Sequence, residues 1–458
     1  MTKAGPRARF PGHLVYALRS DPLRFLTRIA RTYGDFVPFR IGRLRMHLVN
    51  DPEAIRECLV TKNDSFTKSP ALRNAKVTLG EGLLTSEGDF HRRQRRLSQP
   101  AFHPQRVAAY AGAMARFADE MTAAWRDGQT LDVHEQMMEV TLRVVAKTLF
   151  DAELPEDVDE IGAAMDVLVK MFRRATNPFG PLLNVLPLPS NFRFLQALGL
   201  VHGTIDRFIR EHRAAGVDRG DLLSMLMRAR DTGGGVTVDP ALAPRPGEVT
   251  GNEGMTDKQL RDEIFTLFTA GHETTANALT FVWYMLGRNP DAESKLHDEV
   301  DRVLAGKPPT AADVDRLPYT RAVLSESMRL YPPAWIVTRQ AKHDVEIGRH
   351  RIPAGGVVML SQWVTHHDER WWPEPQRFDP GRWLAEPAVE RPRYAYFPFG
   401  GGARSCIGEF FARMEATLII AAVARGWRME VVAKGEPALQ PTITLRPRNP
   451  LKVVVRKR

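Results

Sequence analysis

Hydrophobic and polar positions follow different periods in different parts of the chain. Over residues 34–49 they alternate, with a turn at Gly42, which predicts a β-hairpin. From about residue 104 to residue 230 the apolar positions recur with a helical period instead. Short strand-like segments return at residues 428–432, 442–445 and 451–456. The pattern predicts a mainly α protein with small β-sheets towards both ends, an α+β arrangement.

The longest predicted helix begins after Thr256, which has the spacing of a capping box with Gln259, and it ends before Pro290. A helix of about 33 residues is about 50 Å long, enough to cross the whole molecule. Its flanks are apolar, whereas residues 270–275 in its centre are largely polar and include Gly271. A helix-interior glycine costs about 1 kcal/mol relative to alanine. Such a patch indicates function; a threonine bonded to its own helix is the structural alternative.

The order of these segments predicts one structural unit. Neither an interdomain linker nor an internal repeat is visible, so we expect residues 1–458 to form a single unit. In it, a β-rich N-terminal part (about 1–80) and a C-terminal part (about 335–458) surround a helical core. Residues 178–189 form a proline-studded break between helices, and the Gly- and Pro-rich residues 231–255 are predicted to be a mobile loop.

Composition limits the class of protein. The 458 residues are 43% hydrophobic, so the chain can bury a large core. The first residues carry charges with no apolar stretch after them, and no run of about 18 apolar residues occurs. We therefore expect neither a signal peptide nor a membrane anchor. With only 2 cysteines, the protein is expected in a reducing cytoplasm.

The formal net charge of +10 raises the question of a nucleic-acid partner. The basic residues are scattered, without an arginine-rich tail or a recognised binding module, so no nucleic acid is expected to bind. Docking of a small acidic redox partner is a better use of such a surface, because opposite charge speeds encounter. A general preference for arginine in the source organism would account for the same surplus, and both possibilities stay open.

The most informative segment is Phe399–Gly408, which contains Cys406. Three consecutive glycines, from Gly400 to Gly402, let the backbone turn sharply and approach another group closely. Arg404 places a fixed positive charge two residues before the thiol. An apolar helix is predicted to follow from Glu409, so the sulfur lies at a helix N-terminus, which favours thiolate over thiol. This pattern favours an iron ligand.

Alternative roles for Cys406 fit the segment less well. A lone cysteine is commonly a small buried hydrophobe, but burial does not require three glycines and an arginine beside it. A phosphate-binding loop needs a Lys-Ser or Lys-Thr pair after its glycines, and none is present. A disulfide with Cys58 stays open, although two cysteines make a poor disulfide framework and cannot form a Cys₄ site. We interpret Cys58 as a core residue of a short helix.

The spacing F-G-x-G-x-R-x-C-x-G around Cys406 resembles, without a gap, the cysteine-ligand motif of the cytochrome P-450 family. Residues 270–275 resemble the oxygen-activation stretch of that family's central helix, and the likeness covers nearly the whole chain. It implies the cytochrome P-450 fold, with a long central helix over haem b (iron protoporphyrin IX). Cys406 is then the metal ligand, and Thr274 and Glu273 are the catalytic residues that deliver protons. Gly271 is expected to open room for O₂.

The resemblance also implies residues that hold the haem. The two propionates need cationic partners, and the family's positions for them correspond to His91, Arg95, Arg339 and Arg404. The family often has tryptophan at the position of His91, so this is a mild departure.

Glu326 and Arg329 supply the family's E-x-x-R pair on one face of a helix. Together with Arg377, they resemble the Glu-Arg-Arg cluster that supports the cysteine loop. We expect this cluster to be structural.

The same resemblance places the substrate pocket among five segments, which are 65–84, 165–172, Ala270, 333–337 and the turn near Ile443. Their side chains suggest an apolar guest of fatty acyl, terpene or steroid-like type, with Arg73 as a weak candidate anchor for a carboxylate.

The implied activity is that of a soluble bacterial-type haem-thiolate monooxygenase, which hydroxylates or epoxidises its substrate with O₂. No flavin or iron–sulfur domain is appended, so electrons from NAD(P)H are expected through a separate ferredoxin or flavodoxin with its reductase. A peroxygenase or isomerase, which would not need Thr274 and Glu273, and a non-catalytic haem sensor or carrier are the alternatives.

Overall fold

The computed structural model describes residues 5–152, 162–164, 167–168, 171, 186–231, 236–238, 254–384 and 390–458. Within these ranges, no helix is long and apolar enough to cross a membrane. The helices of the first half are α1 His13–Ser20, α2 Pro22–Tyr33, α3 Pro52–Arg56, α4 Pro70–Asn74, α5 Lys76–Leu79, α6 Gly88–Ser98, α7 Pro104–Ala109, α8 Ala111–Ala123 and α9 Val133–Phe150. Those of the second half are α12 Pro189–Ala215, α13 Leu222–Arg228, α14 Asp257–Leu286, α15 Pro290–Leu304, α16 Pro318–Leu330, α17 Gln362–Thr365 and α18 Glu409–Ala424.

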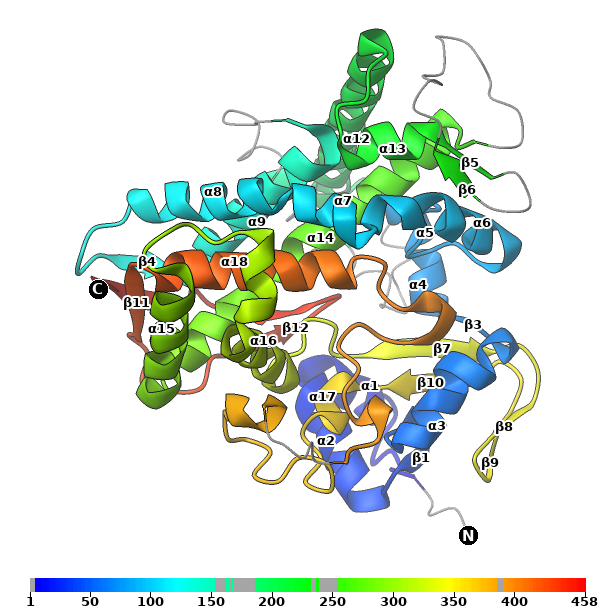
Figure 1. The fold of residues 1–458 in the computed structure, drawn as a ribbon. Coiled ribbons are helices and arrows are strands. Elements are labelled where there is room, and N and C mark those ends of the chain that lie inside the picture. The colour runs from blue at the N-terminus through cyan, green and yellow to red at the C-terminus, as the bar shows by residue number, and fades with distance from the viewer. Residues whose placement is uncertain are drawn as a thin grey trace.

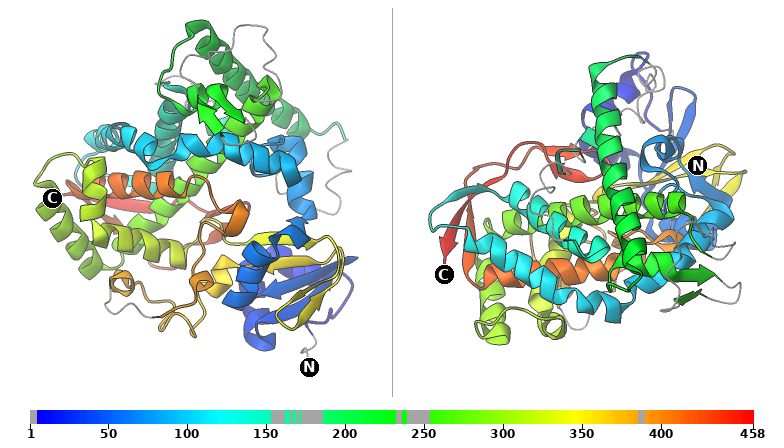
Figure 2. Two further views of the ribbon diagram at one scale, coloured as in Figure 1. Left: turned by 45° about the vertical axis from the view of Figure 1, so that its right-hand side comes forward. Right: turned by 90° about the horizontal axis from the view of Figure 1, so that it is seen from above.

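The largest sheet joins two distant parts of the chain. Its strands, in spatial order, are β1 Phe36–Ile41, β2 Leu44–Val49, β10 Val357–Leu360, β7 Val337–Ala341 and β3 Phe66–Lys68. Strand β10 runs parallel to β2 and antiparallel to β7. Figures 1 and 2 show the blue N-terminal strands beside the yellow later ones, at the end of the molecule that also holds α1 to α3.

Smaller sheets complete the strand set. A three-stranded sheet pairs β14 Lys452–Lys457 with both β11 Trp427–Val431 and β4 Thr130–Asp132. Two-stranded pairs are formed by β12 Leu439–Pro441 with β13 Leu445–Pro447, by β5 Ala229–Asp231 with β6 Val236–Val238, and by β8 Val345–Ile347 with β9 His350–Ile352.

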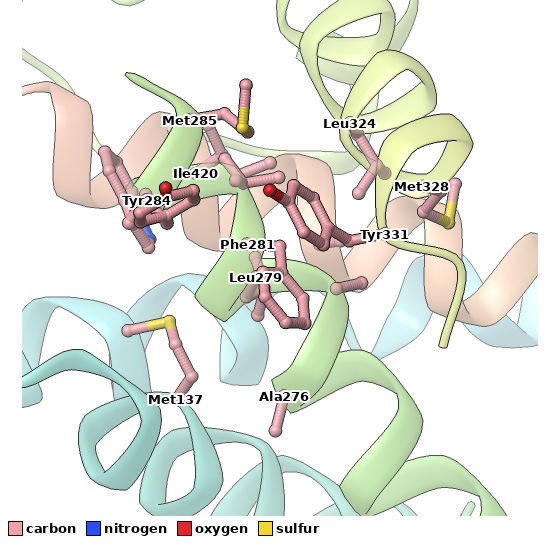
Figure 3. Packing of buried hydrophobic residues seen from close by; sticks show 14 of the residues in the cluster. Met137, Ala276, Leu279, Phe281, Tyr284, Met285, Leu324, Met328, Tyr331 and Ile420 are labelled. Atoms are coloured by element: carbon pink, nitrogen blue, oxygen red, sulfur yellow. The ribbon is translucent and has the colours of Figure 1, made fainter. Parts of the chain in front are cut away.

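Helix α14 is the axis of the helical part. It has the predicted capping box, in which Thr256 and Gln259 bond reciprocally, and it ends at Leu286, three residues before the predicted stop. Its C-terminal half packs against α9, α16 and α18 through fully buried side chains. Figure 3 shows this packing, in which the Phe281 and Tyr331 rings stack with centroids 4.4 Å apart. The packing fixes the polar centre of α14 beside α9 and α18.

The sequence-based expectations are largely confirmed. The mainly α fold with small sheets is present, and the hairpin of residues 34–49 is β1 and β2. The C-terminal strands β11, β13 and β14 occur with shifted bounds, while β12 was not predicted. The predicted break at 178–189 lies largely outside the described residues. In the predicted loop 231–255, β6 pairs with β5, and residues 232–235 and 239–253 lie outside the described residues.

Candidate functional site

The loop that carries Cys406 depends on its glycines. Gly400 and Gly402 have positive φ angles of 71° and 67°. A Cβ at Gly402 would lie 1.9 Å from the Leu59 carbonyl oxygen, so only glycine fits there. The Cys406 N–H donates to the Phe399 carbonyl at 2.9 Å and closes the loop. The close approach predicted from the three glycines therefore exists, and its partner is the protein backbone.

The Cys406 residue is exposed. Burial raises the pKa of the thiol, the Gly408 backbone N–H lowers it, Glu409 raises it and Arg95 lowers it. The helix N-terminus was expected to favour the thiolate. Its amide acts in that direction, but desolvation is the larger effect in the protein alone. Cys406 therefore keeps accessible surface, while nearby protein atoms desolvate its thiol.

The centre of α14 also presents open surface. Ala270 is exposed and Thr274 half-buried, in contrast to the fully buried flanks of this helix. The Thr274 hydroxyl donates to the Ala270 carbonyl at 2.6 Å. This bond to its own helix is the alternative that the sequence left open, and it leaves lone pairs of Oγ1 able to accept.

Gly271 lies against a neighbouring helix. A Cβ at this position would lie 3.3 Å from Cγ2 of Val145 on α9. The expectation that Gly271 makes room for O₂ stays a prediction. The glycine lets α14 pack closely against α9, on the side where Val145 lies.

Glu273 is held by Arg446 of strand β13 and by Thr444, the residue before that strand. The Thr444 hydroxyl donates to Oε1 of Glu273 at 2.7 Å, and Nη1 of Arg446 lies 3.8 Å from the same oxygen. The Asn277 side-chain amide, one turn further along α14, donates to Thr444 Oγ1 at 3.3 Å. Sequence analysis missed Thr444 and Arg446, because their distance from Glu273 along the chain gives no local pattern.

The four residues predicted to hold propionates come together. His91 and Arg95 lie on α6, Arg339 lies on β7, and Arg404 precedes Cys406. His91 and Arg339 are buried, and Nε of Arg339 has no hydrogen-bond partner in the described residues. Burial and the charges of Arg404, Lys68, Arg95 and Arg339, in that order, lower the pKa of His91 to about 3. Burial is the largest of these effects, and the smaller charge effects indicate that the four cations lie near His91.

Lys68, at the end of β3, belongs to the same group and was not predicted. Its side chain is buried, and its ammonium donates to the carbonyls of Leu83, at 2.9 Å, and Leu84. Burial and then Arg404 lower the pKa of Lys68 to about 6, while Glu87 raises it. A lone lysine in a short strand resembles any surface lysine, so no sequence pattern distinguished it.

Comparison with known proteins identifies the family. The family model described as Cytochrome P450 matches residues 4–455. The chain belongs to the cytochrome P450 family.

Relatives of this P450 include three proteins from Streptomyces. It is 42% identical to cyclooctatin synthase of Streptomyces melanosporofaciens over 95% of this chain and 92% of the relative. It is 38% identical to cyclooctat-9-en-7-ol 5-monooxygenase of the same species, over 92% and 88%. It is 35% identical to pentalenene oxygenase of Streptomyces avermitilis, over 92% and 89%. This P450 is a haem-thiolate monooxygenase with haem b, and NAD(P)H-derived electrons reach it through redox partners.

The residues of this P450 suit haem b. Lys68, His91 and Arg339 form a buried cluster of basic side chains, extended by the half-buried Arg95 and Arg404. Such a cluster is costly unless anions offset it, and the two haem propionates supply two negative charges. Nε of Arg339, which has no hydrogen-bond partner among the described residues, would be one donor available to them. Cys406 and the open centre of α14 provide a sulfur and an exposed helix face.

The Glu-Arg-Arg cluster of this P450 has a different third member from the one expected. Glu326 and Arg329 form a fully buried ion pair, with two bonds of 2.8 and 2.9 Å. Arg382 reaches Glu326 at 3.3 Å, and Trp383 donates to it at 3.0 Å. The Arg377 side chain instead lies exposed and pairs with Glu374. The prediction of Arg377 was wrong, because only its backbone carbonyl contacts the cluster, through Arg329.

The segments predicted to line the substrate pocket divide into two groups. Exposed or half-buried apolar residues are Leu72, Leu84, Ala270, Ile336, Val337 and Ile443. Phe66, Leu79 and Trp335 are instead part of the core, and most of residues 165–172 lie outside the described residues. The Arg73 guanidinium bonds to Thr67, the Lys68 carbonyl and Gln340, which makes it a poor anchor for a carboxylate. A groove of about 780 Å³ between α2 and Arg448 contains none of the predicted site residues.

Proposed function

We propose that this P450 hydroxylates or epoxidises a cyclic, terpene-type hydrocarbon, with Cys406 as the iron ligand. The observation that carries the proposal is the exposed Cys406 beside the buried basic cluster. The names of the relatives, pentalenene oxygenase and cyclooctat-9-en-7-ol 5-monooxygenase, favour the terpene class over fatty acyl or steroid-like substrates. The apolar character of Leu72, Ile336 and Ile443 agrees with such a guest.

The chain's own residues bind the cofactor and move protons. Bound haem supplies the iron centre that activates O₂. Four side chains hold the propionates by charge and hydrogen bonding, and they are those of Arg95, Arg339, Arg404 and His91. Thr274 accepts a hydrogen bond through Oγ1, since its proton is donated to Ala270. Glu273 takes up protons at its carboxylate and passes them towards Thr274.

We propose a ferredoxin or flavodoxin with its reductase as the electron donor, in the cytoplasm. Arg95 of α6 bonds to the Ser405 carbonyl at 2.7 Å, so α6 adjoins the cysteine loop. Arg92 and Arg96 of this helix are exposed, as is Phe410 at the start of α18. A basic surface with an apolar centre next to Cys406 supports docking of an acidic partner.

The first test is the carbon monoxide difference spectrum of the dithionite-reduced protein. A strongly red-shifted Soret band in the wild type, and its loss in Cys406→Ser, is the expected result. Cys58→Ser is the matched control and should keep the band, because Cys58 is a fully buried core residue. A band typical of histidine-ligated haem in the wild type would overturn the assignment of Cys406.

The substrate class is tested by the shift of the ferric Soret band when ligands bind. Pentalenene should produce a saturable shift at lower concentration than a fatty acid or a steroid of similar size. Tighter binding of the fatty acid would contradict the terpene assignment. A Thr274→Ala variant that keeps full coupling of NAD(P)H to product would instead favour the peroxygenase alternative.

A further inference from the structure

Glu273, the acid of the central helix α14, contacts Thr444 and Arg446 at strand β13. We propose that Thr444 and Arg446 are positioning residues, which hold Glu273 as a carboxylate turned towards β13 and thereby set the pH at which it relays protons. This rests on the proposed function of Glu273. Its evidence is separate, because it comes from the hydrogen bond of 2.7 Å and the ion pair at 3.8 Å.

The direction of the hydrogen bonds fixes which atom accepts. Asn277 is fully buried and donates its amide N–H to Thr444 Oγ1. Thr444 is 5% exposed and donates its hydroxyl proton to Glu273 Oε1. Because the single hydroxyl proton of Thr444 is used in this bond, Oε1 has to be the acceptor. The chain Asn277–Thr444–Glu273 therefore favours the carboxylate and fixes its orientation.

Arg446 supplies the charge that stabilises this carboxylate. The side chains of Arg446 and Glu273 are 10% and 7% exposed, so water screens the pair poorly. Other titratable groups face the same part of α14 from the neighbouring helices. On α18, Glu415 lies beside Thr275, and burial raises its pKa well above the ordinary value. On α9, His134 lies 3.3 Å from Thr280. Among these groups Arg446 is the permanent cation.

The strand that carries the pair is anchored independently of Glu273. The Leu445 N–H donates to the Pro333 carbonyl at 2.9 Å, and Arg446 pairs with Gln440 of β12. Thr444 and Arg446 flank Leu445, so this anchoring sets the positions of both. Loss of either side chain is therefore expected to change the state of Glu273 without unfolding the strand.

The test compares Arg446→Gln, Arg446→Lys and Thr444→Val in the holoenzyme. Arg448→Gln is the matched control, since Arg448 lies two residues further on, is exposed and donates to the Leu439 carbonyl. Infrared difference spectra record the carboxylic acid C=O band that is lost in Glu273→Gln. Removing the cation lets the carboxyl keep its proton to higher pH, so the band should persist about one pH unit higher in Arg446→Gln. Arg446→Lys keeps a cation, so it should return the band most of the way to the wild-type pH. Thr444→Val should move the band to higher pH, in the same direction as Arg446→Gln.

The second readout is the coupling of NAD(P)H consumption to product across the same pH range. The acid limb of this profile, where coupling falls as the pH decreases, should move to higher pH in Arg446→Gln. It should stay in place in Arg448→Gln. An infrared band and an acid limb that remain at the wild-type pH in both Arg446 variants would overturn the proposal. The infrared result does not require turnover, so a wrong substrate or reaction would leave it interpretable.

Discussion

Substitution of two glycines in the cysteine loop should have different effects. One position would add only backbone strain, and the other would also add a steric overlap. Gly400 and Gly402 both have positive φ. A Cβ at Gly400 would meet no described atom within 4 Å, whereas one at Gly402 would overlap the Leu59 carbonyl oxygen. Alanine at Gly400 therefore adds only strain, of about 1–2 kcal/mol, while alanine at Gly402 also has to displace the loop.

We expect Gly402→Ala to lose the red-shifted carbon monoxide band and to bind haem weakly, because displacement of the loop moves Cys406. Gly400→Ala should keep the band and show only a lower melting temperature. Both are measured by reduced carbon monoxide spectra and thermal unfolding. A normal band in Gly402→Ala would show that the close approach to Leu59 is dispensable.

Glu263 of α14 is a buried carboxyl near Lys68 of the basic cluster. It is 1% exposed, its Oε2 accepts from the Leu83 N–H at 3.0 Å, and burial raises its pKa to about 8. The folded protein therefore keeps a proton that the unfolded chain releases near pH 4.5. Stability is consequently lost as pH rises from 4.5 towards 8, by at most about 5 kcal/mol.

Replacing Glu263 by glutamine should remove this pH dependence. Glu263→Gln keeps the acceptor for Leu83 and cannot ionise, so it should gain stability over the wild type between pH 5 and pH 8. Urea unfolding of both proteins at pH 5, 7 and 9 measures the difference. Parallel curves for the two proteins would contradict the raised pKa.

At the scale of elements, two arginines near the Glu-Arg-Arg cluster differ in their contacts. Arg382 is bonded to the buried Glu326, whereas Arg377 is exposed and pairs with Glu374. Arg382→Ala should cost about 2 kcal/mol, because a hydrogen bond to a buried charge is lost. Arg377→Ala should leave the free energy of unfolding nearly unchanged, because the ion pair of Arg377 is exposed. Equal losses of unfolding free energy in the two variants, measured by urea unfolding, would show that the Arg377 side chain belongs to the cluster.

The elements that sequence analysis predicted are those with local causes. The capping box of Thr256 and the glycines around Cys406 act within a few residues, so their patterns are visible in the chain. Lys68, Arg382 and Arg446 obtain their partners from packing between distant segments, and the sequence holds no periodic trace of such pairing. Gly271 was recognised as special, but only the packing of α14 on α9 shows which neighbour requires it.

At the scale of the whole molecule, the sheets connect the ends of the chain. The five-stranded sheet combines residues 36–68 with 337–360, and β14 pairs with β4 across more than 300 positions. We therefore expect residues 1–458 to unfold as one unit. Loss of the Soret band and loss of far-UV circular dichroism should coincide during urea unfolding of the holoenzyme. Separate transitions would show that the β-rich and helical parts are independent.

Glu273 and its partner Thr444 are 171 residues apart in the sequence, which has a consequence during synthesis on the ribosome. Domains form from the N-terminus as the chain emerges, and the central helix with Glu273 is translated long before Thr444 and Arg446. Until residues 444–446 emerge, the carboxylate of Glu273 lacks the hydroxyl of Thr444 and the guanidinium of Arg446. A nascent chain can thus hold a formed central helix and still lack these two contacts. Under the proposed role of Glu273, its proton relay would be set only after residues 444–446 have been synthesised and have folded back onto α14.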